Sequence, residues 1–246
     1  MLSYRHNMKY IDITLPTPEH NLACDEALLD LCEEGLEGEI LRFWEPQDYF
    51  IVLGYSGKIQ SEVHFSACQV KKIPLLRRPS GGGAVLQGPG CLNYSLILEI
   101  QKSPALVQIS KTNFFIMEHH KKALSSVIGN DIEIRGFSDL TRGPLKFSGN
   151  AQRRKKCFLL YHGSFLLSFH IPLMDQLLKI PLRQPAYRKN RSHSDFVTNL
   201  NTPADKVKKA VRRIWNASGV LEQIPSERIE QLVQERYGTS EWNFKF

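Results

Sequence analysis

The sequence predicts an α+β fold in which a mixed or largely antiparallel sheet is flanked by helices. Strand-like segments occur in pairs, single helical segments separate the pairs, and the spacing in the middle of the chain is typical of hairpins. With 246 residues and no break in composition, the chain can bury one large core. We therefore expect one main domain over residues 1–220, followed by a C-terminal helix and tail over residues 221–246.

The N-terminal half carries both strand and helix periodicity. Alternating or continuous apolar residues predict strands at 10–15, 41–44, 50–54 and 73–76. Apolar residues at helical spacing predict a helix that begins at residue 21 and is ended by Gly35 and Gly38. A second, shorter helix is expected at 61–68.

The C-terminal half continues the same alternation. Strands are expected at 92–100, at 132–134 and at 158–169, the last as one kinked strand or as a pair. Helices are expected at 111–128, at 203–214, where Pro203 opens the helix, and at 226–237. Residues 183–199 are basic, polar and interrupted by proline, which predicts a loop.

Composition restricts the class of protein. No apolar run approaches the roughly 18 residues that span a bilayer, and residues 1–6 do not begin a signal peptide. The five cysteines are scattered and form no Cys-x-x-Cys pair, which argues against a disulfide scaffold and against structural zinc. We therefore expect a cytoplasmic protein that does not act at a membrane.

The formal net charge of +7 favours an acidic partner, and nucleic acid, an acidic protein and an anionic cofactor are all compatible with it. The aromatic residues lie mostly in strand-like segments and are not interleaved with lysine and arginine. A nucleic-acid-binding surface is therefore not expected.

Three consecutive glycines form the most distinctive loop of the chain. The loop reads Arg77-Arg78-Pro79-Ser80-Gly81-Gly82-Gly83-Ala84-Val85 and lies between the strands expected at 73–76 and 92–100. Glycine lets backbone N–H groups approach a ligand, and the arginines supply planar forks for carboxylate or phosphate. The loop matches neither the Walker A pattern nor the dinucleotide-binding fingerprint. By itself it is equally compatible with a hairpin that carries incidental arginines.

A second segment makes the glycine loop interpretable. Lys146-Phe147-Ser148-Gly149-Asn150-Ala151 places a lysine one step from a turn of small residues, and Tyr161-His162-Gly163-Ser164-Phe165 follows it. A lysine in that position can hold its ammonium group against backbone N–H groups, an arrangement that binds a carboxylate beside a phosphate. A plain surface lysine is the alternative.

The order and spacing of these segments resemble the lipoate–protein ligase A family, which shares a superfamily with octanoyl transferases and biotin–protein ligases. The matching motifs are Arg-x-Ser-Gly-Gly-Gly-Ala-Val at 78–85, Leu92-Asn93-Tyr94-Ser95, Lys-x-Ser-Gly-x-Ala at 146–151 and His-Gly-Ser-Phe-Leu-Leu at 162–167. Residues 21–28 also look like the opening helix of that family, so the likeness covers about residues 8–216. It implies a catalytic domain over 1–220 and no accessory domain in 221–246.

The resemblance implies a role for each matching residue. The nucleotide phosphate and the acyl-adenylate would be bound by Arg78, Gly83, Ala84, Val85 and Leu86, with Ser80, Gly81 and Gly82 shaping the loop and Asp139 near the adenosine. Lys146, the catalytic residue, would contact both the lipoate carboxylate and the α-phosphate. The acyl channel would be bordered by Gly149, Asn150, Ala151, His162 and Gly163, and residues 183–199 would fold over the adenylate.

The implied reaction joins lipoate or octanoate to a specific lysine through an acyl-AMP made from ATP, with Mg²⁺ implied and its ligands unidentified. A fatty carboxylate is a poor acyl donor until it becomes a mixed anhydride. Its attack on ATP brings two anions together, which fixed cations such as Arg78 and Lys146 stabilise. The implied acceptors are apo lipoyl domains of 2-oxoacid dehydrogenases or the glycine cleavage H protein, and a separate accessory protein is a further expected partner.

Cysteine positions separate ligases from transferases in this superfamily. The octanoyl transferases use a cysteine upstream of the Lys-x-x-Gly turn or in a Pro-Cys-Gly motif, where this chain has Ser138-Asp139 and Pro181-Leu182. Cys157 matches neither position, although the basic run 153–156 before it could activate its thiol. We therefore expect a ligase. A transferase that uses preformed acyl-AMP or an acyl-protein donor is the alternative, and a non-catalytic basic binding module is a more remote one.

One departure from the family pattern follows the glycine loop. Where the family usually has His-Asp before the next glycine, this chain has Gln87 followed by Gly88. The family role of that pair is therefore not carried over to Gln87.

Overall fold

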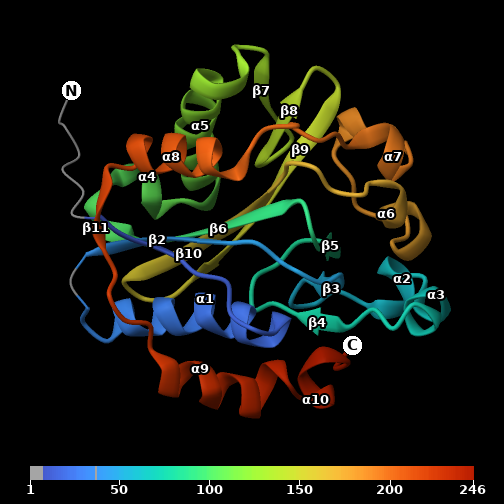
Figure 1. The fold of residues 1–246 in the computed structure, drawn as a ribbon, viewed down its shortest axis with the longest axis horizontal. Coiled ribbons are helices and arrows are strands. Elements are labelled where there is room, and N and C mark those ends of the chain that lie inside the picture. Colours follow the sequence, from blue (N-terminus) through green and yellow to red (C-terminus); the bar gives the residue numbers. More distant parts are fainter. Residues whose placement is uncertain (1–7, 37) are drawn as a thin grey trace.

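A central mixed sheet lies between helices in the computed structural model, which describes residues 8–36 and 38–246 (Figure 1). Among these residues the large sheet has the strand order β11-β1-β2-β6-β10-β9-β8-β7. β1 is parallel to both of its neighbours, and the other pairs are antiparallel. The predicted α+β fold with a mixed, largely antiparallel sheet is therefore confirmed. The strands are β1 (Met8–Asp12), β2 (Glu39–Trp44), β6 (Cys91–Glu99), β7 (Ile132–Arg135), β8 (Asp139–Arg142), β9 (Leu145–Arg154), β10 (Phe158–Leu166) and β11 (Ala217–Val220).

A second, smaller sheet carries the glycine loop. In it β3 (Phe50–Leu53) is parallel to β4 (Leu75–Arg77) and antiparallel to β5 (Val85–Gln87). The loop connects β4 to β5, so the strand that follows it is β5 and not the expected segment 92–100. β5 has only three residues, and this length is too short for apolar alternation to reveal it.

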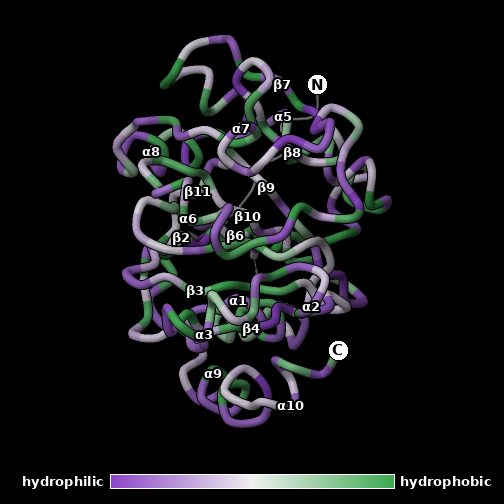
Figure 2. The backbone as a smooth tube through the Cα atoms, turned by 90° about the vertical axis from the view of Figure 1, so that its right-hand side faces the viewer, coloured by the Kyte–Doolittle hydropathy of each residue, from purple (hydrophilic) through white to green (hydrophobic). Residues whose placement is uncertain are grey.

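Helices cover both faces of the large sheet (Figures 1 and 2). α5 (Ile109–Ile128) and α8 (Ala204–Ile214) pack together and share one buried apolar cluster with one face of the sheet. On the other face lies α1 (Pro18–Glu33), with α9 (Ser226–Leu232) and the π-helical turn η3 (Val233–Tyr237) packed against it. Successive strand residues point to opposite faces and so serve two different cores.

The remaining helices are short, and two of them replace one predicted helix. The helix expected at 61–68 is divided, because Val63 is extended and pairs with Leu178. The short helices are α2 (Ile59–Glu62), α3 (Phe65–Val70), η1 (Ile100–Lys102), α4 (Pro104–Val107), α6 (Pro172–Leu177), η2 (Ala186–Arg188), α7 (His193–Phe196) and α10 (Ser240–Asn243).

β9 and β10 form one long hairpin, which the sequence did not predict. The segment expected at 158–169 as a kinked strand or a pair is the single strand β10, and its partner β9 precedes it in the chain. The small and polar residues of β9 conceal its strand character, since they interrupt apolar alternation. β10 also pairs with β6 along its whole length. The lysine motif and the histidine motif therefore lie on neighbouring strands.

The C-terminal residues pack onto the rest of the structure. α9 contacts α1, and α10 contacts β4. The expected boundary at residue 220, between the main domain and the C-terminal helix and tail, stays a prediction. Residues 183–199, expected to form a loop, contain η2 and α7 and are otherwise irregular. In the part of the chain described, no helix is both long and apolar enough to cross a membrane. Residues 1–6, on which the expectation about a signal peptide rests, lie outside the described residues.

Candidate functional site

One cavity of about 300 Å³ is enclosed by the glycine loop, by β9 and β10 and by the segment from α6 to α7. Both predicted motifs line it. Of the residues predicted for the site, the wall contains Arg78, Gly82, Gly83, Ala84, Val85, Leu86, Lys146, Gly149, Asn150, Ala151, His162 and Gly163. The other three, Ser80, Gly81 and Asp139, lie outside this wall, and each is bonded to a residue that forms it.

The Arg78 guanidinium is buried beneath the glycine loop. Its nitrogen atoms donate to the backbone carbonyl oxygens of Val52, Gly81 and Gly83 at distances of 2.8 to 3.2 Å. Burial lowers the pKa of Arg78 to about 10, and the carboxylate of Glu62 opposes this effect. The guanidinium is therefore charged at neutral pH, and its hydrogen bonds hold the loop in one shape.

Two glycines allow the loop to lie directly on the end of β3. Gly82 has a φ of +93°, in the left-handed region that favours glycine. A Cβ added at Gly54 would lie 1.9 Å from the carbonyl oxygen of Gly82. A larger residue at Gly54 would therefore push the loop out of the cavity wall.

Ser80 ties the loop to β10. Its hydroxyl lies 2.6 Å from Nε2 of His162, and Nδ1 of His162 lies 3.8 Å from the carboxylate of Asp25 on α1. Asp25 accepts a hydrogen bond of 2.6 Å from Arg42. Burial would raise the pKa of Asp25, but Arg42 and His162 together bring it below its usual value. Serine, histidine and aspartate side chains in such an order can activate the serine as a nucleophile. Ser80 is only 1% exposed and so is closed to a substrate, and its hydroxyl positions the loop.

A β-bulge directs Lys146 into the cavity. The pairing of β8 with β9 shifts so that Phe147 is an extra residue on β9. Because side chains alternate along a strand, this extra residue brings Lys146 to the same side as Gly149. Its ammonium group then reaches over the glycine, and an added Cβ at Gly149 would lie 2.9 Å from Nζ.

Two of the groups that were predicted to bind anions already contact carboxylates of the protein itself. Nζ of Lys146 forms an ion pair of 2.8 Å with Asp139, whose other oxygen accepts a hydrogen bond of 2.7 Å from Tyr187. Burial and the Asp139 carboxylate raise the pKa of Tyr187, so its phenol stays a neutral donor. In the glycine loop, the N–H of Ala84 donates to Glu62 at 2.5 Å. Both positions therefore attract negative charge.

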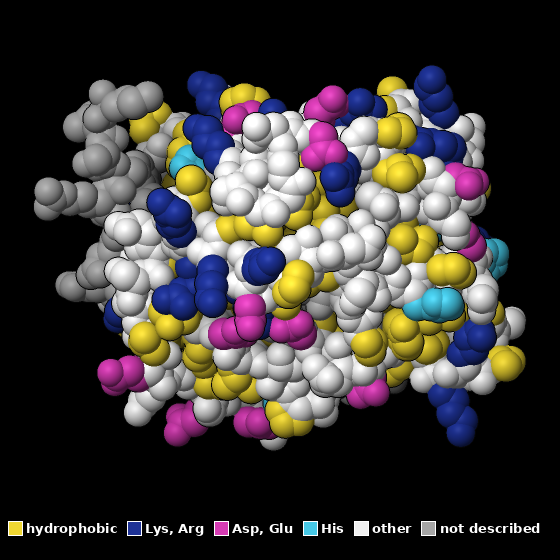
Figure 3. Space-filling model, turned by 45° about the horizontal axis from the view of Figure 1, so that its top comes forward, with side chains coloured by type: hydrophobic (Ala, Val, Ile, Leu, Met, Phe, Trp, Pro, Cys, Tyr) yellow, Lys and Arg dark blue, Asp and Glu magenta, His cyan; other side chains and the backbone are white. Residues whose placement is uncertain are grey.

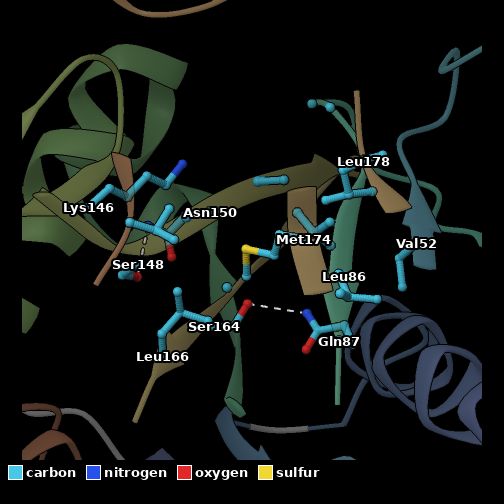
Figure 4. Close-up of a pocket in the computed structure, with 18 of the residues that line it drawn as sticks. Val52, Leu86, Gln87, Lys146, Ser148, Asn150, Ser164, Leu166, Met174 and Leu178 are labelled. Atoms are coloured by element: carbon cyan, nitrogen blue, oxygen red, sulfur yellow. Dashed lines mark hydrogen bonds between the residues drawn. The ribbon is translucent and has the colours of Figure 1, made fainter. Parts of the chain in front are cut away.

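Several residues of the wall were not predicted as site residues. α6 contributes apolar side chains to the wall. The segment 183–199, which was expected to fold over the adenylate, also lines the cavity, and the backbone N–H of Thr198 donates to the carbonyl of Lys146 at 2.9 Å. Figure 4 shows Met174 and Leu178 facing the cavity from α6 and its end. The buried acid on α1 had a recognisable signal, as a charge within an apolar helix face, and Gln87 had one as a departure from the family pattern. The unpredicted residues include Asp25, Trp44, Glu62, Gln87, Asn93, Met174 and Leu178.

The resemblance implies Mg²⁺, and the carboxylates near the cavity test this expectation. Among the described residues, no group of three or more His, Cys, Asp or Glu side chains could hold a metal ion. Asp139 and Glu62 are engaged by Lys146 and by the Ala84 N–H. Mg²⁺ usually keeps several waters and uses one or two carboxylates with substrate phosphates. The donors present do not fit a site built by the protein alone.

The positive net charge is not concentrated on the face of the molecule that Figure 3 shows. Lys and Arg side chains there lie among Asp and Glu side chains and apolar ones. Charge on this face is therefore partly neutralised by near neighbours. Elsewhere among the described residues, ion pairs such as that of Lys208 with Asp12 and Glu45, at 2.9 and 2.6 Å, also bring opposite charges together.

The fold and the site together are those of a lipoyl protein ligase A/B type of catalytic domain. A mixed sheet presents a bulge-directed lysine to a glycine loop carried by a second small sheet. Residues 17–214 match the family model described as the lipoyl protein ligase A/B catalytic domain. The chain belongs to this family, and the resemblance inferred from its motifs is confirmed.

Curated relatives include both transferases and ligases. The octanoyltransferase LipM of Halalkalibacterium halodurans is 28% identical over 96% of this chain and 98% of the relative. LipM of Carboxydothermus hydrogenoformans is also 28% identical, over 97% of this chain and 98% of the relative. A probable lipoate-protein ligase A of Mycoplasma pneumoniae is 27% identical over 96% of this chain and 72% of the relative. The chain is thus an enzyme of a family whose members attach lipoyl and octanoyl groups.

Solved structures show the same fold. A bi-partite lipoate protein ligase from Thermoplasma acidophilum superimposes with a TM-score of 0.81 at 24% identity, covering 96% of both chains. A putative lipoate protein ligase from the same organism, with bound lipoic acid, gives a TM-score of 0.78 at 22% identity, covering 97% of this chain and 98% of that one. A lipoate-protein ligase A bound with ATP gives 0.73 at 24% identity, covering 96% and 97%.

Proposed function

We propose that the protein joins lipoate or octanoate to a specific lysine of an acceptor protein through an acyl-AMP made from ATP. The observation that carries this proposal is the cavity in which Lys146 faces the glycine loop. The lysine supplies a cation and the loop supplies backbone N–H groups, which together suit a carboxylate beside a phosphate. The carboxylates of Asp139 and Glu62 at these two points support the assignment.

In the proposed first step, the acyl carboxylate attacks the α-phosphate of ATP, the bond to pyrophosphate breaks, and acyl-AMP forms. Lys146 would lie against both anions and reduce their repulsion. Arg78 would act through the loop that it braces, because most of its N–H groups point to backbone carbonyls. In the second step, the acceptor amine attacks the anhydride carbonyl and AMP leaves. Positioning is sufficient for that step, and no protein nucleophile is needed.

A transferase is the second candidate, because similar relatives are named octanoyltransferases. Such an enzyme would hold the acyl group on a thiolate. All five cysteines belong to the described residues, and none of them lines the cavity. Four are buried, and burial raises the pKa of Cys24 to about 11 and that of Cys91 to about 12. These thiols are poor candidates for nucleophiles.

Cys157 is the exposed cysteine, and it lies far from the lysine. It is in the turn between β9 and β10, at the opposite end of β9 from Lys146. Strand rise puts the two ends about 25 Å apart. The backbone N–H groups of the turn donate to the carboxylate of Glu33. This placement favours the ligase over a transferase that uses this thiol.

Mass spectrometry of an acceptor domain tests the proposal. Purified protein is mixed with ATP, Mg²⁺, lipoate and an apo lipoyl domain, and the domain should gain one lipoyl group only when ATP is present. Cys157→Ser should retain this activity. Transfer from octanoyl-carrier protein without ATP, through a hydroxylamine-sensitive adduct that Cys157→Ser loses together with activity, would establish the transferase. Activity with lipoyl-AMP but not with ATP would show that the enzyme takes a preformed adenylate.

We propose apo lipoyl domains of 2-oxoacid dehydrogenases and the glycine cleavage H protein as acceptors, in the cytoplasm. One similar structure is a bi-partite lipoate protein ligase described with its E2 lipoyl domain, which supports the first acceptor. The two-part construction of that ligase also supports a separate accessory protein for this one. Adding that partner to the assay above would then raise the rate with ATP more than the rate with lipoyl-AMP.

A further inference from the structure

Three residues from three neighbouring strands stand in one row across the large sheet. Strand pairing places Tyr94 of β6 opposite Gly163 of β10, and Gly163 opposite Asn150 of β9. Residues directly opposite in antiparallel strands point to the same face. Gly163 has no side chain, and a Cβ added there would lie 1.9 Å from Oδ1 of Asn150. The glycine therefore leaves the space in which the side chains of Tyr94 and Asn150 meet.

The Asn150 amide is bonded to the protein at both ends. Its Oδ1 accepts a hydrogen bond from the phenol of Tyr94, and its Nδ2 donates to the backbone carbonyl oxygen of Ser138 at 2.5 Å. Nδ2 also lies 3.3 Å from Sδ of Met117. A carbonyl oxygen can only accept, so the amide nitrogen has to face Ser138 and the amide oxygen has to face Tyr94. The amide is therefore directed to the protein itself, although Asn150 lies in the cavity wall.

The Tyr94 ring is fixed in the core. It has no exposed surface, its ring stacks on Phe165 with the centroids 5.0 Å apart, and His120 meets it edge-on at 4.5 Å. Burial raises the pKa of Tyr94 well above its usual value, so the phenol stays a neutral donor. Tyr94 is thus a fixed point that holds the amide of Asn150.

Asn150 holds the backbone directly before the residue that orients the lysine. Ser138 precedes Asp139, whose carboxylate forms the ion pair of 2.8 Å with Lys146. The pairing of β8 with β9 begins at Leu140, so the ladder between these strands does not include Ser138 or Asp139. The Asn150 side chain supplies the connection to β9 at that point.

We infer that Tyr94 and Asn150 are positioning residues for Lys146. They act through the Ser138 carbonyl and the Asp139 carboxylate, and neither has to touch the substrate. The inference rests on the proposed function, because it takes Lys146 as the group that stabilises the reacting anions. An ammonium group does this only while it is held in one place, since a displacement of about 1 Å can cost a large factor in rate.

The loss of one hydroxyl tests the inference. Tyr94→Phe keeps the ring and leaves Oδ1 of Asn150 without its partner. With ATP, Mg²⁺, lipoate and an apo lipoyl domain, its kcat should fall about fivefold or more while the KM for lipoate does not rise. Asn150→Leu, which keeps side-chain volume, should behave in the same way.

Tyr237→Phe is the matched control. Tyr237 is another fully buried tyrosine whose phenol donates a hydrogen bond, in this case to Glu26, and neither residue lines the cavity. The variant therefore loses a comparable buried hydrogen bond, and it should keep the wild-type kcat and KM.

A double-mutant cycle separates positioning from general support of the fold. In a Lys146→Ala protein there is no ammonium group to position, so adding Tyr94→Phe should change the remaining rate by less than about twofold. A general structural role would lower the rate by the same factor in both backgrounds. The cycle with Asn150→Leu decides if Tyr94→Phe does not fold. Equal factors in both backgrounds, an unchanged kcat in both variants, or a raised KM for lipoate with an unchanged kcat would overturn the inference.

A measurement without turnover separates this inference from the proposed function. If no product forms, the proposed function has failed, and the reactivity of Lys146 toward acetic anhydride decides the positioning instead. An amine paired with a carboxylate is held in its charged form and reacts slowly. Tyr94→Phe should raise the acetylation rate of Lys146 severalfold, as measured by peptide mass spectrometry. Lys208, whose partners Asp12 and Glu45 take no part in these contacts, should react as in wild type. An unchanged rate at Lys146 would overturn the inference.

Discussion

The ammonium nitrogen of Lys146 lies 2.8 Å from a carboxylate oxygen of Asp139, at the edge of the cavity. The pair is partly buried, with 27% of the lysine side chain and 13% of the aspartate side chain exposed. A ligand carboxylate that reaches Lys146 has to compete with Asp139, which Tyr187 continues to hold through its other oxygen. The aspartate therefore orients the lysine before a substrate arrives.

We expect Lys146→Ala to lower acyl transfer at saturating lipoate and ATP by about 10² to 10³, the usual loss for one group that stabilises developing charge. The fold should survive, because the side chain lies at the cavity edge. Asp139→Asn is the matched control, since it keeps the shape and removes the competing charge, and it should lower the KM for lipoate. Mass spectrometry of the acceptor gives the rates, and a Lys146→Ala enzyme with most of the wild-type rate would contradict the assignment.

Gly149→Ala should reduce activity by displacing the ammonium group. The new Cβ would lie 2.9 Å from Nζ of Lys146, so the lysine has to leave its position over the strand. We expect a loss of kcat of about tenfold or more with little change in melting temperature, because misplaced catalytic groups are inefficient. Gly219→Ala on β11, where the nearest atom would be 3.5 Å away, is the control and should behave like wild type. Equal kinetics for the two variants would refute the steric argument.

Glu62→Gln should lower the KM for ATP. The Glu62 carboxylate accepts the N–H of Ala84, a group that we assign to the nucleotide phosphate. Removing its charge removes one repulsion from the incoming anion, an effect of about fivefold in a partly hydrated site. Glu222→Gln, at an exposed position, changes the net charge equally and serves as the control. Initial rates against ATP concentration measure this effect, and an unchanged or raised KM for Glu62→Gln would count against the assignment.

Asn243→Ala should weaken the glycine loop from a distance. Asn243 accepts the backbone N–H of Arg77 at 3.0 Å through its side chain, and its carbonyl accepts the Arg77 guanidinium at 3.1 Å. The same guanidinium donates to Gly54, on which Gly82 lies. We expect a loss of about 1–3 kcal/mol in the free energy of unfolding, as for a buried donor left unpaired, and a rise in KM for ATP larger than that for lipoate.

The control for this effect is Ser240→Ala, an exposed position in the same short helix. It should leave the melting temperature and both KM values close to wild type. If Asn243→Ala raised the KM for ATP and the KM for lipoate equally, the C-terminal segment would support the fold in general and not the loop in particular.

Asp25→Asn should destabilise the protein in a pH-dependent way. It leaves the fully buried guanidinium of Arg42 without its ion-pair partner, which costs about 3–5 kcal/mol near neutral pH. The pKa of Asp25 in the folded protein lies below its usual value of 3.8. Its contribution is therefore present above the unfolded pKa and is lost as the pH falls through the folded pKa. Urea unfolding should show a constant difference from wild type above about pH 5 and a smaller one at about pH 3. A difference that grows on acidification would contradict this sign.

Local patterns were sufficient for the class of fold and for the two motifs. The helix expected at 111–128 is α5, Ile109–Ile128, because a long amphipathic period and a terminal glycine depend only on neighbours in the chain. The glycine loop and the lysine motif were recognisable for the same reason, since each is a short run of residue types. β5 and β9 were not predicted, because a short strand and a strand of small and polar residues owe their form to their partners.

What each motif does was decided by contacts between distant segments. The sequence by itself determined that a lysine stands near a turn of small residues, but only the pairing of β8 with β9 creates the bulge that turns Lys146 toward the cavity. It determined an arginine beside three glycines, but only burial under the loop directs Arg78 to backbone carbonyls. Asp25, Glu62 and Gln87 share no pattern in the sequence, and only the tertiary structure brings them to one cavity. The physical reason is that side chains from different elements meet only when those whole elements pack together, which the order of residues within one element does not determine.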